Sequence, residues 1–122
     1  MTKILIAEDD EDSLDMLSRR LTLQGFDIVT AKTGSEAVAM AERDMPDVIV
    51  MGLNMPGMTG WEAARAIKAS PATAKIRIIA LSAHATSGDH DEAYQAGCDA
   101  FESKPVDLNR LMKRIREVLG GE

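Results

Sequence analysis

Short apolar runs alternate with longer amphipathic segments along the whole chain. The runs are rich in β-branched residues and nearly continuous in hydrophobicity, which is typical of strands that are buried on both faces of a parallel sheet. We expect strands at Lys3–Ala7, Asp27–Ala31, Asp47–Met51, Arg77–Ser82 and Ala100–Ser103.

The segments between these runs carry apolar residues at helical spacing. In the first, Leu14, Leu17 and Leu21 fall on one face, and Gly25 follows them as a natural helix stop. Capping-box patterns or apolar stripes indicate the other helices at Thr33–Glu36, Thr59–Glu62, Asp89–Gly97 and Leu108–Leu119. The alternation predicts an α/β fold of the flavodoxin-like (βα)5 type, a doubly wound parallel sheet with strand order 2-1-3-4-5.

In such a sheet ligands bind beyond the carboxyl ends of the strands, so the residues that follow each strand are the candidates for chemistry. Glu8 and Asp9 follow the first strand directly. Adjacent carboxylates repel each other unless they are protonated or bind a cation, and hard oxygen ligands suit Mg²⁺ or Ca²⁺. The preference of acidic residues for a helix N-terminus accounts for the neighbouring Glu11 and Asp12. It fits Glu8 and Asp9 less well, because these two residues follow a buried strand directly.

Three further strand ends carry Gly52, Ser82 and Lys104. A lone lysine is usually a solvated surface charge, but here it shares an edge with the acidic pair and a hydroxyl. A cation, a lysine and a hydroxyl together could cradle a phosphoryl group. Gly52 is unexpected, because glycine weakens a strand and supplies no chemistry.

The overall composition narrows the class of protein. The 122 residues suit one domain, 1–122, and carry a net charge of −6, which opposes binding to nucleic acid. One cysteine excludes an internal disulfide and suits the reducing cytoplasm, and no apolar run approaches the length of a membrane span. We therefore expect a cytoplasmic protein whose partner is another protein or a small ligand.

Five stretches in the right order resemble the receiver domain of response regulators, of the CheY-like kind, which acts in two-component phosphorelay signalling. They are ILIAEDDED, PDVIVMGLNMPGMTGWE, IIALSAHA, AGCDAFESKP and the last helix. The resemblance implies that Glu8 and Asp9 hold Mg²⁺ together with the backbone carbonyl of Asn54. It also implies a module that takes part in phosphoryl transfer without being an enzyme in the usual sense.

The same resemblance assigns the phosphoryl-contacting residues. Ser82 matches the hydroxyl that bonds the phosphoryl group and moves on activation, while Leu53 and the small residue Ala83 would contact it through their backbone. Lys104 matches the lysine that pairs with a phosphoryl oxygen, and its bond to Pro105 is often cis in the family. Phe101 occupies the position of the rotating aromatic switch.

The chain departs from the family pattern at one decisive position. The aspartate that accepts the phosphoryl group would stand at Gly52, which has no side chain to form an acyl phosphate. Asp47 begins the same strand at its far end, and Asp9 would cease to be a metal ligand if it were the acceptor. We therefore expect no phosphorylation at the usual site, through natural loss or engineered substitution, and weakened binding of Mg²⁺.

The expected partners are a sensor histidine kinase or a histidine phosphotransfer protein, for which Met16 and Arg20 are candidate contacts, and a downstream protein target. The face of the fourth helix, fifth strand and fifth helix is the candidate output surface, for a monomer or weak dimer without an effector domain. The main alternative is a pseudo-receiver that works independently of phosphorylation. A Mg²⁺-dependent phosphatase of the haloacid-dehalogenase type and a nucleotide-binding flavodoxin relative fit the acidic first loop less well.

Overall fold

The expected α/β sandwich is present in the computed structural model, which describes residues 1–82 and 87–120. Five parallel strands are ordered β2-β1-β3-β4-β5, as predicted. Their bounds are β1 Lys3–Ala7, β2 Asp27–Ala31, β3 Val48–Gly52, β4 Arg77–Ser82 and β5 Ala100–Ser103. The helices are α1 Glu11–Leu23, α2 Gly34–Asp44, α3 Gly60–Ala69, α4 Ser87–Gln95 and α5 Leu108–Val118.

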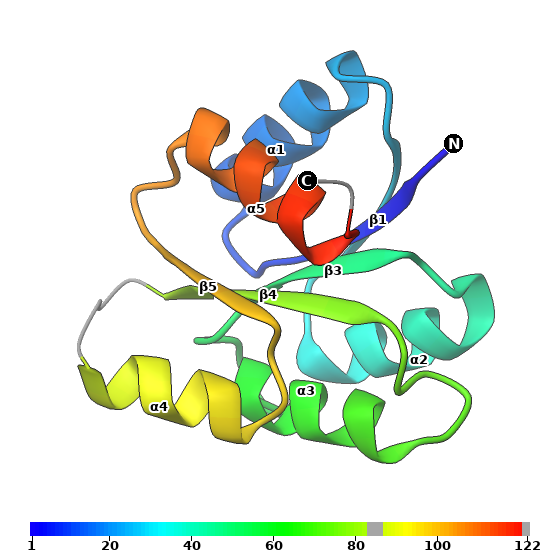
Figure 1. Ribbon diagram of the computed structural model, residues 1–122, viewed down its shortest axis with the longest axis vertical. Helices are drawn as coiled ribbons and strands as arrows, with labels where there is room; N and C mark the ends of the chain where they lie inside the picture. Colours follow the sequence, from blue (N-terminus) through cyan, green and yellow to red (C-terminus); the bar gives the residue numbers. More distant parts are fainter. Residues whose placement is uncertain (83–86, 121–122) are drawn as a thin grey trace.

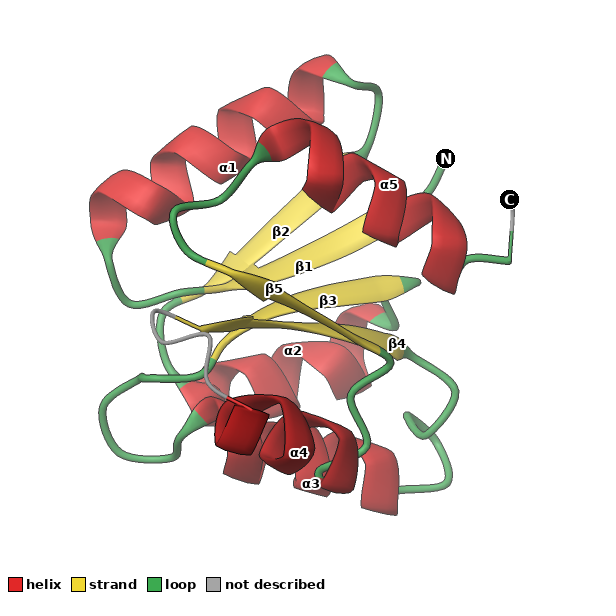
Figure 2. Ribbon diagram, turned by 60° about the vertical axis from the view of Figure 1, so that its left-hand side comes forward, coloured by secondary structure: helices red, strands yellow, loops and turns green. Residues whose placement is uncertain are grey.

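The helices cover both faces of the sheet. Helices α1 and α5 lie on one face, and α2, α3 and α4 lie on the other (Figure 1, Figure 2). Two apolar clusters result. One, with Ile6, Leu17 and Ile115, fills the space between the sheet and helices α1 and α5. The other, with Ile49 and Ile67, lies on the opposite face of the sheet. Within the described part of the chain, no helix is both long enough and apolar enough to cross a membrane.

Strand β3 differs from the prediction by one residue at each end. Asp47 lies outside the strand, where its carboxylate accepts the backbone N–H of Lys3 at 2.9 Å. At the other end Gly52 is part of the strand and pairs with Leu81 in the register of β4. Neighbouring strands thus set the bounds of β3, because their backbone groups give Gly52 a partner despite its low strand propensity.

The helix ends follow local chemistry with one correction. Thr59 and Glu62 form the complete capping box at α3, but at α2 only the Thr33 side chain bonds back to Glu36. The Glu36 carboxylate instead accepts the N–H of Lys32 at 2.6 Å. The expected stop after α1 is confirmed, because Gly25 has a φ of 96°, which glycine adopts without strain.

Two smaller expectations are also corrected. Leu119, expected in the last apolar stripe, caps α5 and is exposed, while Leu111 and Ile115 are the buried members of that stripe. Helix α4 begins at Ser87, two residues before the expected Asp89, and ends at Gln95.

Candidate functional site

The candidate residues gather where the parallel strands end. Glu8 follows β1, Gly52 ends β3, Ser82 ends β4 and Lys104 follows β5. The strand register holds these ends at one edge: Gly52 lies opposite Leu81, one residue before Ser82. Three central strands and one edge strand therefore converge on a single site, as the topology predicts.

An ion pair between Glu8 and Lys104 dominates this edge. The Lys104 ammonium donates to Oε1 of Glu8 at 2.6 Å, although the two residues are 96 positions apart in the chain. Glu8 is only 2% exposed, whereas the Lys104 side chain is 28% exposed. Because the pair is largely removed from water, its attraction is stronger than that of a surface pair, and the carboxylate needs this partner.

The remaining polar atoms of the pair are held by backbone groups. Oε2 of Glu8 accepts the N–H of Asp10 at 3.2 Å, and the Glu8 N–H donates to the carbonyl of Ala31 at 3.0 Å. The N–H of Lys104 donates to the carbonyl of Ser82 at 2.7 Å. The backbone of Glu8 is thus bonded to β2 and that of Lys104 to β4, which holds both residues at this edge of the sheet.

Gly52 lies directly beside this pair. A Cβ at Gly52 would stand 3.2 Å from the Ala7 carbonyl oxygen and 3.2 Å from Oε1 of Glu8. A side chain here would therefore point at the Glu8 carboxylate and require it to move by a few tenths of an ångström. Gly60 closes the other side, since a Cβ there would collide with the carbonyl of Gly52.

The residues expected to hold Mg²⁺ form a weak set of ligands. Asp9 and Asn54 are exposed, and the Glu8 carboxylate is already paired with Lys104. Over the described residues, no three acidic, histidine or cysteine side chains come together as a metal cluster. A hard divalent cation prefers several oxygen ligands, so this donor set fits the ion poorly without a carboxylate at position 52.

Asp10, next to the acidic pair, has a structural role. It caps α1, and hydrogen bonds from the side chain and backbone of Ser13 lower the pKa of its carboxyl group. A capping carboxylate of this kind is engaged with the helix rather than available to a ligand.

The other residues that the resemblance assigns to the phosphoryl site and the switch differ in burial and in their partners. Ser82 and Phe101 are buried, and Phe101 belongs to the apolar cluster beneath α3. The N–H of Leu53 donates to the carbonyl of Leu81 at 3.1 Å. The peptide bond from Lys104 to Pro105 is cis, as the resemblance implies. Ala83 lies outside the described residues.

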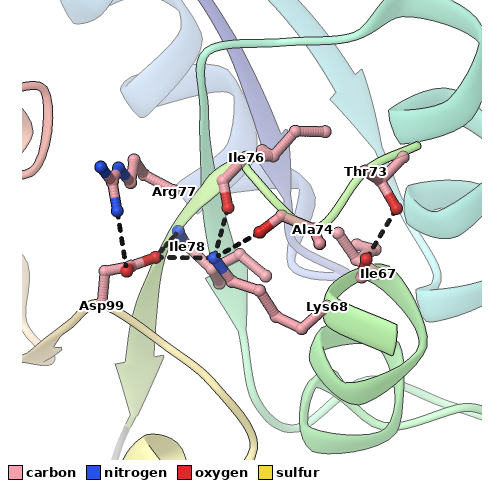
Figure 3. Close-up of polar contacts among 8 residues, drawn as sticks. All are labelled: Ile67, Lys68, Thr73, Ala74, Ile76, Arg77, Ile78 and Asp99. Carbon is pink, nitrogen blue, oxygen red and sulfur yellow. Dashed lines mark hydrogen bonds and ion pairs between the residues drawn. The ribbon is translucent and has the colours of Figure 1, made fainter. Parts of the chain in front are cut away.

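A second polar cluster, at the opposite edge of the sheet, is not evident in the sequence pattern (Figure 3). The Lys68 ammonium donates to Oδ2 of Asp99 at 3.1 Å and to the carbonyls of Ile76 and Ala74 at 2.6 and 3.3 Å. The same Oδ2 accepts the N–H of Ile78 at 2.9 Å. This cluster ties the end of α3 to the starts of β4 and β5.

Cys98 lies beside this second cluster and has an unreactive thiol. Burial, reinforced by the neighbouring Asp99 carboxylate, raises the pKa of the thiol to about 12. The thiolate is the reactive form of cysteine, so this side chain is not a nucleophile near neutral pH.

The chain is similar to known proteins over nearly its whole length. Residues 4–116 match the family model of the response regulator receiver domain. The chain is 34% identical over 116 residues to the response regulator PleD of Caulobacter vibrioides, covering 95% of this chain and 26% of PleD. It thus spans about a quarter of that relative.

Two more similarities cover nearly the full chain. The polar-differentiation response regulator DivK of Brucella ovis is 31% identical over 121 residues, which is 98% of each chain. The receiver domain of the sensor histidine kinase PA1611 from Pseudomonas aeruginosa, solved with a magnesium ion coordinated in its active site cleft, superposes with a TM-score of 0.90. It is 30% identical over 98% of both chains.

Proposed function

Because this chain belongs to the family of response regulator receiver domains, we propose that it signals through protein contacts without accepting a phosphoryl group at the usual position. The observation that carries the proposal is Gly52, which ends β3 beside the Glu8–Lys104 pair. Receivers store the signal as an acyl phosphate on a carboxylate, and glycine offers no oxygen nucleophile.

The rest of the phosphorylation apparatus is retained, which supports a receiver that lost its acceptor. Glu8, Asp9, Ser82 and Lys104 keep the residue types that the family uses, and they lie at the same edge of the sheet. Mg²⁺ binding is weakened here, because position 52 contributes neither a ligand nor a negative charge.

The proposed partners are those of a receiver. A sensor histidine kinase or histidine phosphotransfer protein would dock on α1, where Met16 is 37% exposed and Arg20 is exposed. A downstream target protein would contact α4, β5 and α5, and neither nucleic acid nor a membrane is a proposed partner. We expect a cytoplasmic monomer or weak dimer.

The Glu8–Lys104 pair also supports a second candidate function, a pseudo-receiver that is independent of phosphate. A short ion pair with a buried carboxylate holds the site in one arrangement without help from a phosphoryl group. Such a domain would present a fixed surface to its partner or respond to a different signal.

The test is the intact mass of the chain after incubation with Mg²⁺ and acetyl phosphate, with the Gly52→Asp variant as the matched control. We expect one phosphoryl group on the variant and none on the chain itself. A stable phosphoryl adduct on the chain with Gly52 would contradict the proposal. Absence of the adduct from both proteins would favour the pseudo-receiver.

A further inference from the structure

We infer that Glu8 is the built-in counter-ion of Lys104 in this receiver, so that the site is closed and charge-balanced without a divalent cation. The inference rests on the proposed loss of the acceptor and adds how the site is stabilised after that loss. The family resemblance implies that Glu8 is a metal ligand, and this inference assigns it a different role.

The first argument is the environment of the carboxylate. Glu8 is 2% exposed, and an ionised carboxylate buried to this degree must be paired or coordinated to a metal ion. Both oxygens already have partners, the Lys104 ammonium at 2.6 Å and the Asp10 N–H at 3.2 Å. The site is therefore satisfied by groups of the chain itself.

The second argument is the space beside Gly52. A Cβ at this position would lie 3.2 Å from Oε1 and 3.5 Å from Cδ of Glu8. The Glu8 carboxylate thus lies against the backbone of Gly52, where a side chain from position 52 would begin. An aspartate there would bring a second negative charge to the same lysine and displace Glu8 toward a cation.

The third argument is competition for one carboxylate. A divalent cation that used Glu8 would have to displace the Lys104 ammonium, because two positive charges that share one carboxylate repel each other. The other candidate ligands belong to Asp9 and Asn54, which are exposed residues, and these two ligands compensate poorly for that loss. Lys104 therefore excludes the cation from this site as long as position 52 is glycine.

The experiment compares thermal unfolding in EDTA and in millimolar MgCl₂ for the chain, Gly52→Asp and Lys104→Met. Lys75→Met serves as the matched control, because Lys75 is an exposed lysine that precedes β4 at the other edge of the sheet. Mg²⁺ should leave the melting temperatures of the chain and of Lys75→Met unchanged. It should raise that of Gly52→Asp most, because this variant gains a ligand, and that of Lys104→Met by less, because this variant only frees Glu8 for the ion.

Titration with Mn²⁺, followed by electron paramagnetic resonance, provides a measurement that does not depend on the folding of Lys104→Met. We expect the chain to bind the ion at least about tenfold more weakly than Gly52→Asp. Loss of a residue that only supports a metal ligand already weakens metal binding by about tenfold or more, and position 52 would supply a ligand itself. Equal affinities, or a Lys104→Met variant that Mg²⁺ does not stabilise, would overturn the inference. Neither result would restore an acceptor to position 52, so the mass measurement tests the proposed function separately.

Discussion

A lysine–carboxylate pair lies at each end of the parallel strands: Lys68–Asp99 at their amino ends (the amino edge) and Glu8–Lys104 at their carboxyl ends (the carboxyl edge). The two pairs differ in how they are bonded to the backbone. At the amino edge Lys68 donates to Asp99 and to two backbone carbonyls, and Asp99 accepts a backbone N–H in return. At the carboxyl edge the Lys104 ammonium donates to Glu8, whose other carboxylate oxygen accepts the N–H of Asp10. The difference lies in the lysines. Lys68 is also bonded to backbone carbonyls and is a fixed part of the fold, whereas Lys104 is bonded to a carboxylate, has a more exposed side chain, and can exchange partners more readily.

This difference matches where a receiver is expected to change. The amino-edge cluster (Lys68, Asp99, Arg77 and the backbone groups they contact) joins α3 to β4 and β5 (Figure 3). The carboxyl edge carries Gly52, Ser82 and Lys104, which stand at the positions to which the family resemblance assigns phosphoryl chemistry. We infer that the first edge holds the sheet together while the second determines the response.

The largest loss of stability should come from Lys68→Met, which breaks the amino-edge cluster. The substitution keeps the apolar stem but leaves the Asp99 carboxylate and two carbonyls without their shared donor. We expect the free energy of unfolding to fall by about 2–3 kcal/mol, since unpaired and partly buried polar groups are costly. Urea unfolding measures this, and a loss below about 1 kcal/mol would contradict the structural role of the cluster.

A smaller loss of stability is expected from Glu8→Gln at the carboxyl edge. Glutamine keeps the shape and can still accept the N–H of Asp10, and the Lys104 side chain, which is partly exposed, can turn into water. We expect a loss of about 1 kcal/mol in the same urea experiment. A loss as large as that of Lys68→Met would show that the two edges are equally rigid and remove the distinction drawn above.

The smallest loss of stability is expected from Arg19→Met, which removes an ion pair whose two side chains are largely exposed. Arg19 and Asp15 approach to 2.7 Å, yet both side chains are well exposed on α1. We expect the free energy of unfolding to change by less than about 0.5 kcal/mol. A larger loss would mean that pair distance, rather than burial and backbone partners, determines stability in this chain.

Much of the fold could be predicted from the sequence because its signals are local. The apolar runs placed four strands correctly, and Thr59 and Glu62 form the expected capping box. The shift of β3 by one residue could not be predicted, since Gly52 gains its strand partner from β4. Long-range pairing overrode the low strand propensity of glycine.

The candidate site was predictable in its location but not in its internal contacts. The strand ends and the order of the strands bring Glu8 and Lys104 to one edge. That Glu8 would pair with Lys104 depends on the room left at Gly52 and on a contact across 96 positions of the chain. No sequence pattern indicated the amino-edge cluster. Lys68 binds backbone carbonyls, which every residue carries, and a carboxylate that lies 31 positions away in the chain.

The most direct test of the central claim is a crystal structure of the unmodified chain grown in excess MgCl₂. We predict that the Lys104 ammonium remains within about 4 Å of the Glu8 carboxylate, with no metal ion between Glu8, Asp9 and Asn54. A magnesium ion bound to Glu8 and Asp9, with Lys104 turned away, would contradict the claim that this site is closed by its own residues.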